Sequence, residues 1–163
     1  MEETELRKHR CCFTGHRPEK LRIGEKRLAQ MLEKEIRKAA AGVFTTFITG
    51  MARGTDLVDA EIVQRLRERD GRLKLICALP HGGFGLRWSG GWTERFRYVL
   101  DQSNLVRTIC PCFSYDAYQI RNEWMVDHSG LVIAVFSGER GGTKNTLDYA
   151  RRKGAACIII DGK

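Results

Sequence analysis

The sequence has few prolines and no long hydrophobic run. Only 3 of its 163 residues are proline and 42% are hydrophobic, which excludes a collagen-like or disordered chain. Apolar stretches such as 131–136 are far shorter than the roughly 20 residues that cross a bilayer. The opening segment, residues 1–9, is mostly charged and lacks the apolar core of an export signal. We therefore expect a cytoplasmic protein with no membrane partner.

The cysteines give no sign of a metal site. Four of the 6 cysteines lie within apolar runs, where a free cysteine behaves as a small hydrophobe. The remaining pair, in Cys110-Pro111-Cys112, lacks the two-residue gap of zinc knuckles, and no second cysteine or histidine pair completes a tetrahedral set. We expect free thiols in a reducing compartment and no metal ion.

Two familiar cofactor signatures are also missing. No loop matches the dinucleotide pattern G-x-G-x-x-G, and no glycine loop is followed by the Lys-Ser/Thr pair of a P-loop. The sequence therefore favours neither a standard NAD enzyme nor an ATPase, and we expect no cofactor.

The net charge is positive but dispersed. Lysine and arginine number 28 against 20 acidic residues, which leaves +8 at neutral pH. Cations and carboxylates are interleaved between residues 61 and 74, and the basic run at 151–153 closes a predicted helix, where it complements the helix dipole. A solvated basic surface is thus favoured over a nucleic-acid-binding stripe, and nucleic acid is the less favoured partner.

Short apolar runs alternate with helical patterns along the chain, which is the signature of an α/β protein. Residues 1–9 are interpreted as a charged N-terminal leader, and 10–163 as a single Rossmann-like domain. Strands are predicted at 11–14, 46–49, 73–79, 105–109, 131–136 and 155–160, all buried on both faces. Helices are predicted at 25–41, after Gly54, and at 93–103, 115–129 and 143–153. The glycine-rich stretch 80–92, which contains two tryptophans, is interpreted as a surface loop or lid.

This order of elements predicts a doubly wound, mainly parallel sheet with helices on both faces. Ligands on such sheets bind beyond the carboxyl ends of the strands. Three of those ends combine glycine, arginine and a hydroxyl group. Glycine allows close backbone approach, a helix N-terminus presents free N–H groups, and arginine grips phosphate oxygens in pairs. The three ends are Thr14-Gly15-His16-Arg17-Pro18, Thr49-Gly50-Met51-Ala52-Arg53-Gly54-Thr55-Asp56 and Ser137-Gly138-Glu139-Arg140-Gly141-Gly142-Thr143.

Each loop alone is equally compatible with ordinary turn chemistry, and Thr55 or Asp56 could simply cap a helix. Three such loops at one sheet edge favour a site for a phosphate-bearing ligand. Arg121 and Asn122, near the start of the predicted helix 115–129, extend this candidate site. The alternative for Arg121 is a surface ion pair with Glu123 or Asp116. His16 and His81 are candidate polar contacts.

Four motifs between residues 10 and 161 carry a family resemblance. They are Cys12-Phe13-Thr14-Gly15-His16-Arg17-Pro18-Glu19-Lys20-Leu21, Thr49 to Asp56 as quoted above, Arg121-Asn122-x-x-Met125-Val126-Asp127-x-Ser129 and Gly141-Gly142-Thr143-x-x-Thr146-x-x-Tyr149-Ala150. Together and in this order they closely resemble the bacterial SLOG family, in the branch that includes the YpsA-like proteins. The superfamily is named for DNA-processing protein A and the Lonely-guy phosphoribohydrolases.

The resemblance implies a Rossmann-like fold and a site for a nucleotide or a nucleotide-derived molecule. Lonely-guy enzymes cleave the N-glycosidic bond of cytokinin nucleotides with an Arg-Lys-x-x-Met helix and a Pro-Gly-Gly-x-Gly-Thr-x-x-Glu loop. Here Arg121-Asn122-x-x-Met125 is similar to the helix. The loop lacks the proline, and the place of its acidic residue falls on Thr146 or Asp148. This departure weighs against hydrolysis, which needs a positioned carboxylate.

The leading hypothesis is a nucleotide-binding sensor protein of the SLOG type. Its predicted ligand-binding residues are Gly15, His16, Arg17, Gly50, Arg53, Gly54, Thr55, Asp56, Arg121, Asn122, Gly141, Gly142 and Thr143. The first alternative is a nucleoside monophosphate phosphoribohydrolase with Asp148 or Asp56 as the acid group. The second alternative is a single-stranded DNA-binding protein like DNA-processing protein A. Relatives are often oligomeric, so a homo-oligomer is a further expectation.

Overall fold

A computed structural model describes residues 2–163 of the chain, so Met1 of the predicted leader lies outside the described residues. The fold is a single sheet of six parallel strands in the order β4-β3-β2-β1-β5-β6. The strands are β1 (Arg10–Gly15), β2 (Thr46–Thr49), β3 (Lys74–Leu79), β4 (Leu105–Thr108), β5 (Leu131–Phe136) and β6 (Ala156–Asp161). The predicted doubly wound sheet is confirmed, and it is wholly parallel.

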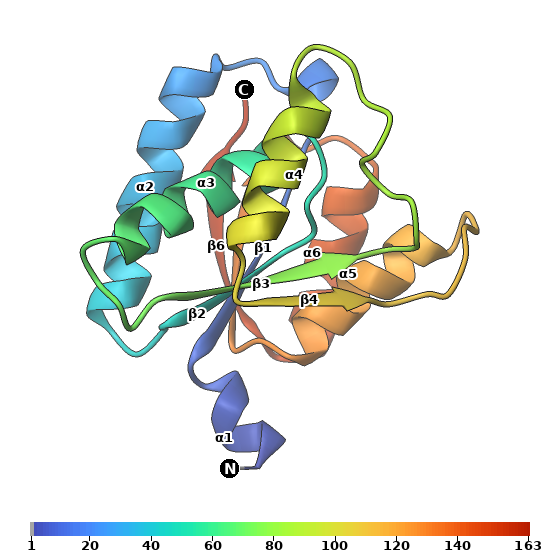
Figure 1. The fold of residues 1–163 in the computed structure, drawn as a ribbon. Helices are drawn as coiled ribbons and strands as arrows, with labels where there is room; N and C mark the ends of the chain where they lie inside the picture. The colour runs from blue at the N-terminus through green and yellow to red at the C-terminus, as the bar shows by residue number, and fades with distance from the viewer. Residues whose placement is uncertain (1) are drawn as a thin grey trace.

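Helices cover both faces of the sheet (Figure 1). The described helices are α1 (Glu3–Arg7), α2 (Glu25–Ala41), α3 (Thr55–Arg67), α4 (Trp92–Gln102), α5 (Ala117–Asp127) and α6 (Gly142–Arg152), with a short 3-10 turn at Pro18–Lys20. The larger apolar core lies beneath α2, α3 and α4, and includes Phe13, Phe47 and Leu57. The smaller core lies beneath α5 and α6, and includes Met125, Val126 and Ala150.

The chain reverses direction across the sheet between β1 and β5. From β1 it proceeds outward through β2, β3 and β4, and then returns to place β5 on the other side of β1. In doubly wound sheets the connections diverge at such a switch point, leaving a crevice beyond the carboxyl ends of the strands. The three loops predicted to bind a ligand follow β1, β2 and β5. These three strands are neighbours at the switch point.

The expectation of strands buried on both faces is wrong for the two edge strands. All four residues of β4 are exposed, and β6 is only partly buried. Edge strands have a neighbour on one side only, so a short apolar run does not by itself reveal whether a strand is central. The four inner strands have the continuous burial that was predicted, apart from residues at or near their ends.

Part of the predicted leader is helical and attached to the domain. The carbonyl oxygen of His9 accepts hydrogen bonds from the N–H groups of Thr45 and Thr46, at 3.1 Å each. Glu3 of α1 accepts a hydrogen bond of 2.5 Å from Arg10. None of the helices in residues 2–163 is long and apolar enough to cross a membrane.

The segment 80–91 turns its aromatic side chains inward. Phe84 is buried, and Trp88 is half-buried against the larger core. The hydroxyl of Thr93 accepts a hydrogen bond of 2.7 Å from the Trp88 N–H and donates one of 2.9 Å to the Gly85 carbonyl. The segment was predicted to be a surface loop or lid, but these two side chains pack inward and complete the core beside α4.

Candidate functional site

A cleft of about 600 Å³ opens at the carboxyl ends of the central strands. Volumes between about 300 and 1,000 Å³ are typical of small-molecule sites. Most of the predicted ligand-binding positions line it together, from separate stretches of chain. They are Gly15, His16, Arg17, Arg53, Asp56, Arg121, Asn122, Gly142 and Thr143. The other four predicted positions, Gly50, Gly54, Thr55 and Gly141, do not line the cleft.

Two glycines allow the loops after β1 and β2 to meet. A Cβ atom on Gly15 would collide with the Thr55 side chain, and one on Gly54 would lie 2.8 Å from the carbonyl oxygen of His16. Gly54 also has a φ of 85°, a conformation that L side chains rarely adopt. The Thr55 hydroxyl closes the contact with a 3.1 Å hydrogen bond to the His16 carbonyl. Thr55 therefore joins two loops, and α3 begins without a side-chain cap.

Gly50 has a different neighbour. A Cβ atom there would lie 2.8 Å from Oδ2 of Asp56 and 2.9 Å from the guanidinium of Arg121. The carbonyl oxygen of Gly50 accepts a hydrogen bond from Nη1 of Arg121. The glycine thus leaves room for a buried cation and a buried carboxyl group at the end of β2.

Arg121 is buried, with 5% of its surface exposed. Besides its bond to Gly50, Nη1 donates to the carbonyl oxygen of Ala78 at 3.4 Å, and Nε donates to Oδ1 of Asn122 at 2.8 Å. It forms no ion pair within residues 2–163, so the alternative of a surface pair with Glu123 or Asp116 is wrong. Nη2 donates no hydrogen bond to the described residues and remains free for a ligand in the cleft.

Asp56 is the one carboxyl group among the described residues that line the cleft. Its Oδ2 accepts a 3.2 Å hydrogen bond from the N–H of Ala52, while Oδ1 has no partner in residues 2–163. Burial raises its pKa to about 6, and the positive charge of Arg121 opposes that rise. A carboxyl group with this pKa changes protonation state close to neutral pH.

A second carboxyl group, Asp59, lies one turn further along α3 and away from the cleft lining. It is fully buried, and neither of its oxygens has a hydrogen-bond partner among the described residues. Burial raises its pKa well above the ordinary value of 3.8, and the nearby charge of Asp56 adds to the effect. Burial in the larger core therefore favours the protonated form of Asp59.

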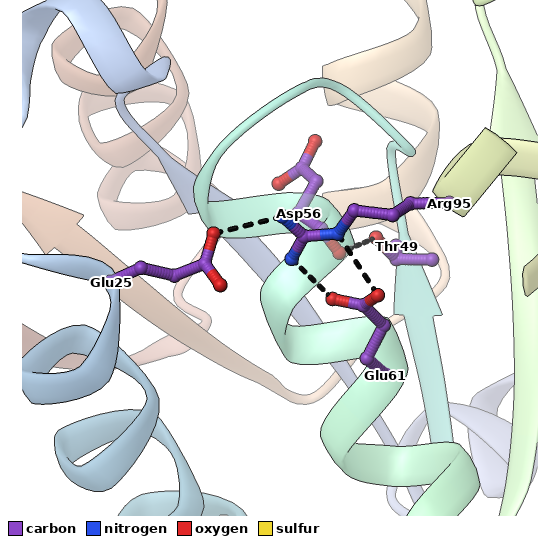
Figure 2. Close-up of polar contacts among 5 residues, drawn as sticks. All are labelled: Glu25, Thr49, Asp56, Glu61 and Arg95. Atoms are coloured by element: carbon purple, nitrogen blue, oxygen red, sulfur yellow. Dashed lines mark hydrogen bonds and ion pairs between the residues drawn. The ribbon is translucent and has the colours of Figure 1, made fainter. Parts of the chain in front are cut away.

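Polar contacts hold α3 at its start and at its middle (Figure 2). The Thr49 hydroxyl at the end of β2 donates a 2.9 Å hydrogen bond to the backbone carbonyl of Asp56. Arg95 of α4 binds both carboxylate oxygens of Glu61, at 2.6 and 3.1 Å, and one oxygen of Glu25 at 2.9 Å. Arg95 thereby links α4 to α3 and α2.

His16 connects the ends of β1 and β5 across the switch point. Its Nε2 lies 3.1 Å from the backbone nitrogen of Ser137 and 2.9 Å from the Ser137 hydroxyl. Because a backbone N–H can only donate, Nε2 accepts, and the neutral ring carries its proton on Nδ1. Burial lowers the pKa of His16, and the charge of Lys20 lowers it further. The Nδ1 proton has no described acceptor in residues 2–163, so His16 can offer a donor to a ligand.

The N-terminus of α6 supplies further donors. Gly142 and Thr143 line the cleft, and a Cβ atom on Gly142 would meet nothing within 4 Å. The helix has no side-chain cap, and the first N–H groups of an α-helix lack intrahelical partners. Gly141, with a φ of 145°, shapes this turn, and Nζ of Lys20 lies 3.3 Å from where its Cβ would be. A helix N-terminus with a nearby lysine is a suitable environment for an anion.

Asp148 lies apart from the cleft. It sits on the outer side of α6, where Lys144 contacts it at 2.8 Å and Arg151 at 3.9 Å. These are ordinary helical pairs between residues three or four positions apart. Of the two candidate acid groups, only Asp56 faces the other predicted site residues.

An aromatic wall faces the cations. His81 contacts Phe84, Phe113 and Tyr118 edge to face, with ring centroids 5.2–5.8 Å apart. All four side chains and Trp88 line the cleft. Edge-to-face clusters of this kind hold one another in place and leave ring surface for a further aromatic group.

Several lining residues were not predicted from the sequence. Lys20 lies within the first quoted motif, and Tyr118 lies three residues before Arg121 on α5, so the motif could have identified the first and helical spacing the second. Arg87 and Phe113 come from irregular segments, 80–91 and 109–116, whose sequence carries no periodic signal. Their placement depends on how the loops fold over the sheet edge.

Comparisons with known sequences agree with the motifs. The family model described as the YspA SLOG family matches residues 11–156. The SPbeta prophage-derived protein YoqJ of Bacillus subtilis (strain 168) is 34% identical over 118 residues, which cover 65% of this chain and 69% of that protein. A UPF0398 protein of Lactiplantibacillus plantarum is 26% identical over 137 residues, covering 83% and 70% of the two chains.

Solved structures show the same fold at low identity. DNA processing protein A from Streptococcus pneumoniae superposes with a TM-score of 0.68 at 18% identity, over 97% of this chain and 52% of that protein. The Helicobacter pylori protein of the same name, described in its single-stranded DNA binding mode, gives a TM-score of 0.65 at 14% identity, over 99% and 68%. This chain thus spans about half of the S. pneumoniae protein. With the family model covering most of its length, the chain belongs to the YspA SLOG family.

Proposed function

We propose that this protein binds a nucleotide or a nucleotide-derived molecule in the cleft at the switch point. The observation that carries the proposal is the meeting of three features in one cavity. A helix N-terminus, a buried arginine with a free Nη2 and an aromatic wall all face the same space. Phosphate oxygens suit the first two, and a planar base suits the third.

The phosphate is expected against Gly142 and Thr143. The open space beside Gly142 allows an anion to approach the N–H groups at the start of α6. Lys20 and the Nδ1 proton of His16 would add a charge and a donor there. The base would then lie against Phe84, Phe113 and Tyr118, which line the same cleft.

Equilibrium binding to a panel of nucleoside mono- and diphosphates tests this proposal. Isothermal titration calorimetry should detect saturable binding of at least one nucleotide, and the corresponding nucleoside without phosphate should bind much more weakly. The proposal would be contradicted if none of the nucleotides showed saturable binding. If a nucleoside bound as tightly as its phosphorylated form, the phosphate would make no contribution to binding, and the proposed phosphate contacts would be wrong.

A second candidate function is hydrolysis of an N-glycosidic bond, and Asp56 is the observation in its favour. A carboxyl group with a pKa of about 6 suits proton transfer near neutral pH. Release of free base from a nucleoside monophosphate, abolished by Asp56→Asn, would establish this activity. Asp148 is not a candidate for this reaction, because it lies outside the cleft and forms ion pairs with Lys144 and Arg151.

Binding of single-stranded DNA is less favoured. The Helicobacter pylori protein is described in its single-stranded DNA binding mode, but a likeness at 14% identity supports the fold alone. In this protein, cations gather within a cavity together with a buried carboxyl group. DNA affinity that falls steeply with salt yet persists as a specific complex at physiological ionic strength would favour this function instead.

A further inference from the structure

The cleft carries more positive charge than one phosphate requires. Its lining includes five cationic side chains, Arg17, Lys20, Arg53, Arg87 and Arg121, against the single carboxyl group of Asp56. Of the five, Arg53 is paired, with Glu19 at 2.5 Å. The other four make no ion pair with any residue in the range 2–163. A phosphate monoester has a charge of about −1.5 to −2 at neutral pH, so one phosphate together with Asp56 leaves about one positive charge of the four unbalanced.

One group of donors lies at the end of β5, and we call it the α6 cluster. It consists of the N–H groups of Gly142 and Thr143, the ammonium of Lys20 and the Nδ1 proton of His16. The 3.3 Å approach of Lys20 to the Cβ position of Gly141 places the lysine beside the helix N-terminus. The bonds from Ser137 to Nε2 of His16 fix the ring on the same side.

A second group lies at the ends of β2 and β3, and we call it the Arg121 cluster. Arg121 is anchored there by the carbonyl oxygens of Gly50 and Ala78, with Nη2 left free. Arg17 is near enough for its charge to act on both Asp56 and Arg121. Asp56 offsets part of this charge without forming a close ion pair, so the cluster remains cationic.

The backbone groups of the two clusters follow different strands, since Gly50 comes directly after β2 and α6 comes after β5. In the order β4-β3-β2-β1-β5-β6, β1 lies between β2 and β5. Neighbouring strands are spaced by about 4.8 Å, so the ends of β2 and β5 are about 10 Å apart. Charge-assisted hydrogen bonds to phosphate oxygens are only about 2.7–2.9 Å long, so a phosphate held at the N–H groups of Gly142 and Thr143 leaves room for a second phosphoryl group beside Arg121.

Building on the proposed nucleotide site, we infer that its ligand carries two phosphoryl groups, one at the α6 cluster and one at the Arg121 cluster. A nucleoside diphosphate or a nucleotide with a diphosphate linkage has this chemistry. A nucleoside monophosphate fills one cluster and leaves the other unsatisfied. The inference thus narrows the ligand class from nucleotides in general to diphosphates.

Calorimetry with matched pairs of ligands tests the inference. AMP and ADP, GMP and GDP, and UMP and UDP are compared at fixed ionic strength with EDTA present, so that protein groups alone bind the phosphates. In at least one pair the diphosphate should bind roughly tenfold or more tightly, because a charged hydrogen bond is worth about 1.5–3 kcal/mol. Equal or tighter binding of the monophosphate in every pair that binds would overturn the inference and leave the proposed function standing. Absence of binding throughout would contradict both.

Two variants separate the clusters. Gly142→Val blocks the α6 cluster, and Arg17→Ala removes a cation from the Arg121 cluster. Both should weaken the preferred diphosphate severalfold, whereas the monophosphate should respond strongly to only one of them. A monophosphate that is equally sensitive to both variants would show a single phosphate site and overturn the inference. Arg69→Ala, which removes an exposed arginine outside the cleft, is the control and should leave the diphosphate-to-monophosphate ratio unchanged.

Discussion

Arg121 and Gly50 lie 71 positions apart in the chain, yet the guanidinium of the first is bonded to the backbone carbonyl of the second. The contact exists because Gly50 has no side chain, since a Cβ there would lie 2.9 Å from Nη1. It holds a buried cation at the ends of β2 and β3, beside the carboxyl group of Asp56. The charge distribution of the cleft therefore depends on a glycine that does not line it.

Gly50→Ala should both destabilise the fold and weaken nucleotide binding. The added methyl group collides with Arg121 and Asp56, and overpacking of this kind costs about 1–3 kcal/mol. Thermal unfolding monitored by circular dichroism measures the first effect and calorimetry the second. Gly71→Ala is a matched control, since its Cβ would meet nothing within 4 Å. Equal stability of the Gly50→Ala and Gly71→Ala proteins would show that Arg121 is not confined by Gly50.

Arg121→Lys should weaken phosphate binding roughly ten- to hundredfold while keeping the charge. A lysine has no planar fork with which to bind the Gly50 carbonyl and a phosphate at the same time, and charged hydrogen bonds are worth about 1.5–3 kcal/mol. Because Arg121 is buried and bonded to the backbone, its loss should also lower the unfolding temperature. Binding like wild type by both Arg121→Lys and Arg121→Ala would give Arg121 a purely structural role.

Gly142→Val should weaken nucleotide binding at least severalfold without unfolding the protein. The position is exposed at the start of α6, and a Cβ there meets no protein atom within 4 Å, so the side chain projects into space that a phosphate would use. Far-ultraviolet circular dichroism checks the fold, and calorimetry checks the affinity. Unchanged affinity in a folded Gly142→Val protein would place the phosphate away from α6.

The buried Asp59 should make stability decrease as pH rises. Its pKa is raised in the folded protein, so above about pH 3.8 the folded state retains a proton that the unfolded chain releases. The contribution of Asp59 to stability is thus greatest below that pH and is lost progressively up to the raised pKa. Asp59→Asn should remove this loss, so its advantage in urea-unfolding free energy over wild type should grow with pH.

Asp70→Asn provides the contrast for the pH series. Arg72 lowers the pKa of Asp70, so the ionised form of Asp70 stabilises the folded protein. The unfolding free energy of the Asp70→Asn protein should therefore fall further below the wild-type value as pH rises. If the difference between the Asp59→Asn protein and wild type does not vary with pH, Asp59 is not held neutral in the folded protein.

His16 should be neutral, with its proton on Nδ1, at and above pH 6.5. The N–H of Ser137 requires a lone pair on Nε2, and burial and Lys20 lower the pKa below its ordinary value of 6.5. The folded protein should therefore lose stability as pH falls from 6.5 through the lowered pKa. Nitrogen-15 NMR of the imidazole reports the tautomer directly, and a proton on Nε2 would contradict this assignment.

Periodicity was sufficient to predict most of the scaffold. The helix 25–41 and the strands 46–49 and 131–136 have the bounds that were predicted, because regular apolar spacing and a terminal glycine specify them locally. Exposure of β4 could not be predicted, since edge position is a property of strand order. The same holds for the inward packing of Phe84 and Trp88, which depends on α4 and α5.

The candidate site likewise has a part that could be predicted from the sequence and a part that could not. Residues after β1, β2 and β5 converge because parallel strands end at one edge, and that is predictable from strand order alone. The sequence did not reveal that Gly15 and Gly54 serve loop contacts, because a glycine required for packing resembles one required for a ligand. Nor did it distinguish Asp56 from Asp148, since burial of one and surface pairing of the other follow from the fold.

A crystal structure of the protein with the tightest-binding nucleotide tests the central claim most directly. Its phosphate oxygens should accept hydrogen bonds from the N–H groups of Gly142 and Thr143 and from Nη2 of Arg121, with the base against Phe84, Phe113 and Tyr118. A nucleotide bound elsewhere, or one whose phosphate contacts neither α6 nor Arg121, would contradict the assignment of this cleft as the nucleotide site.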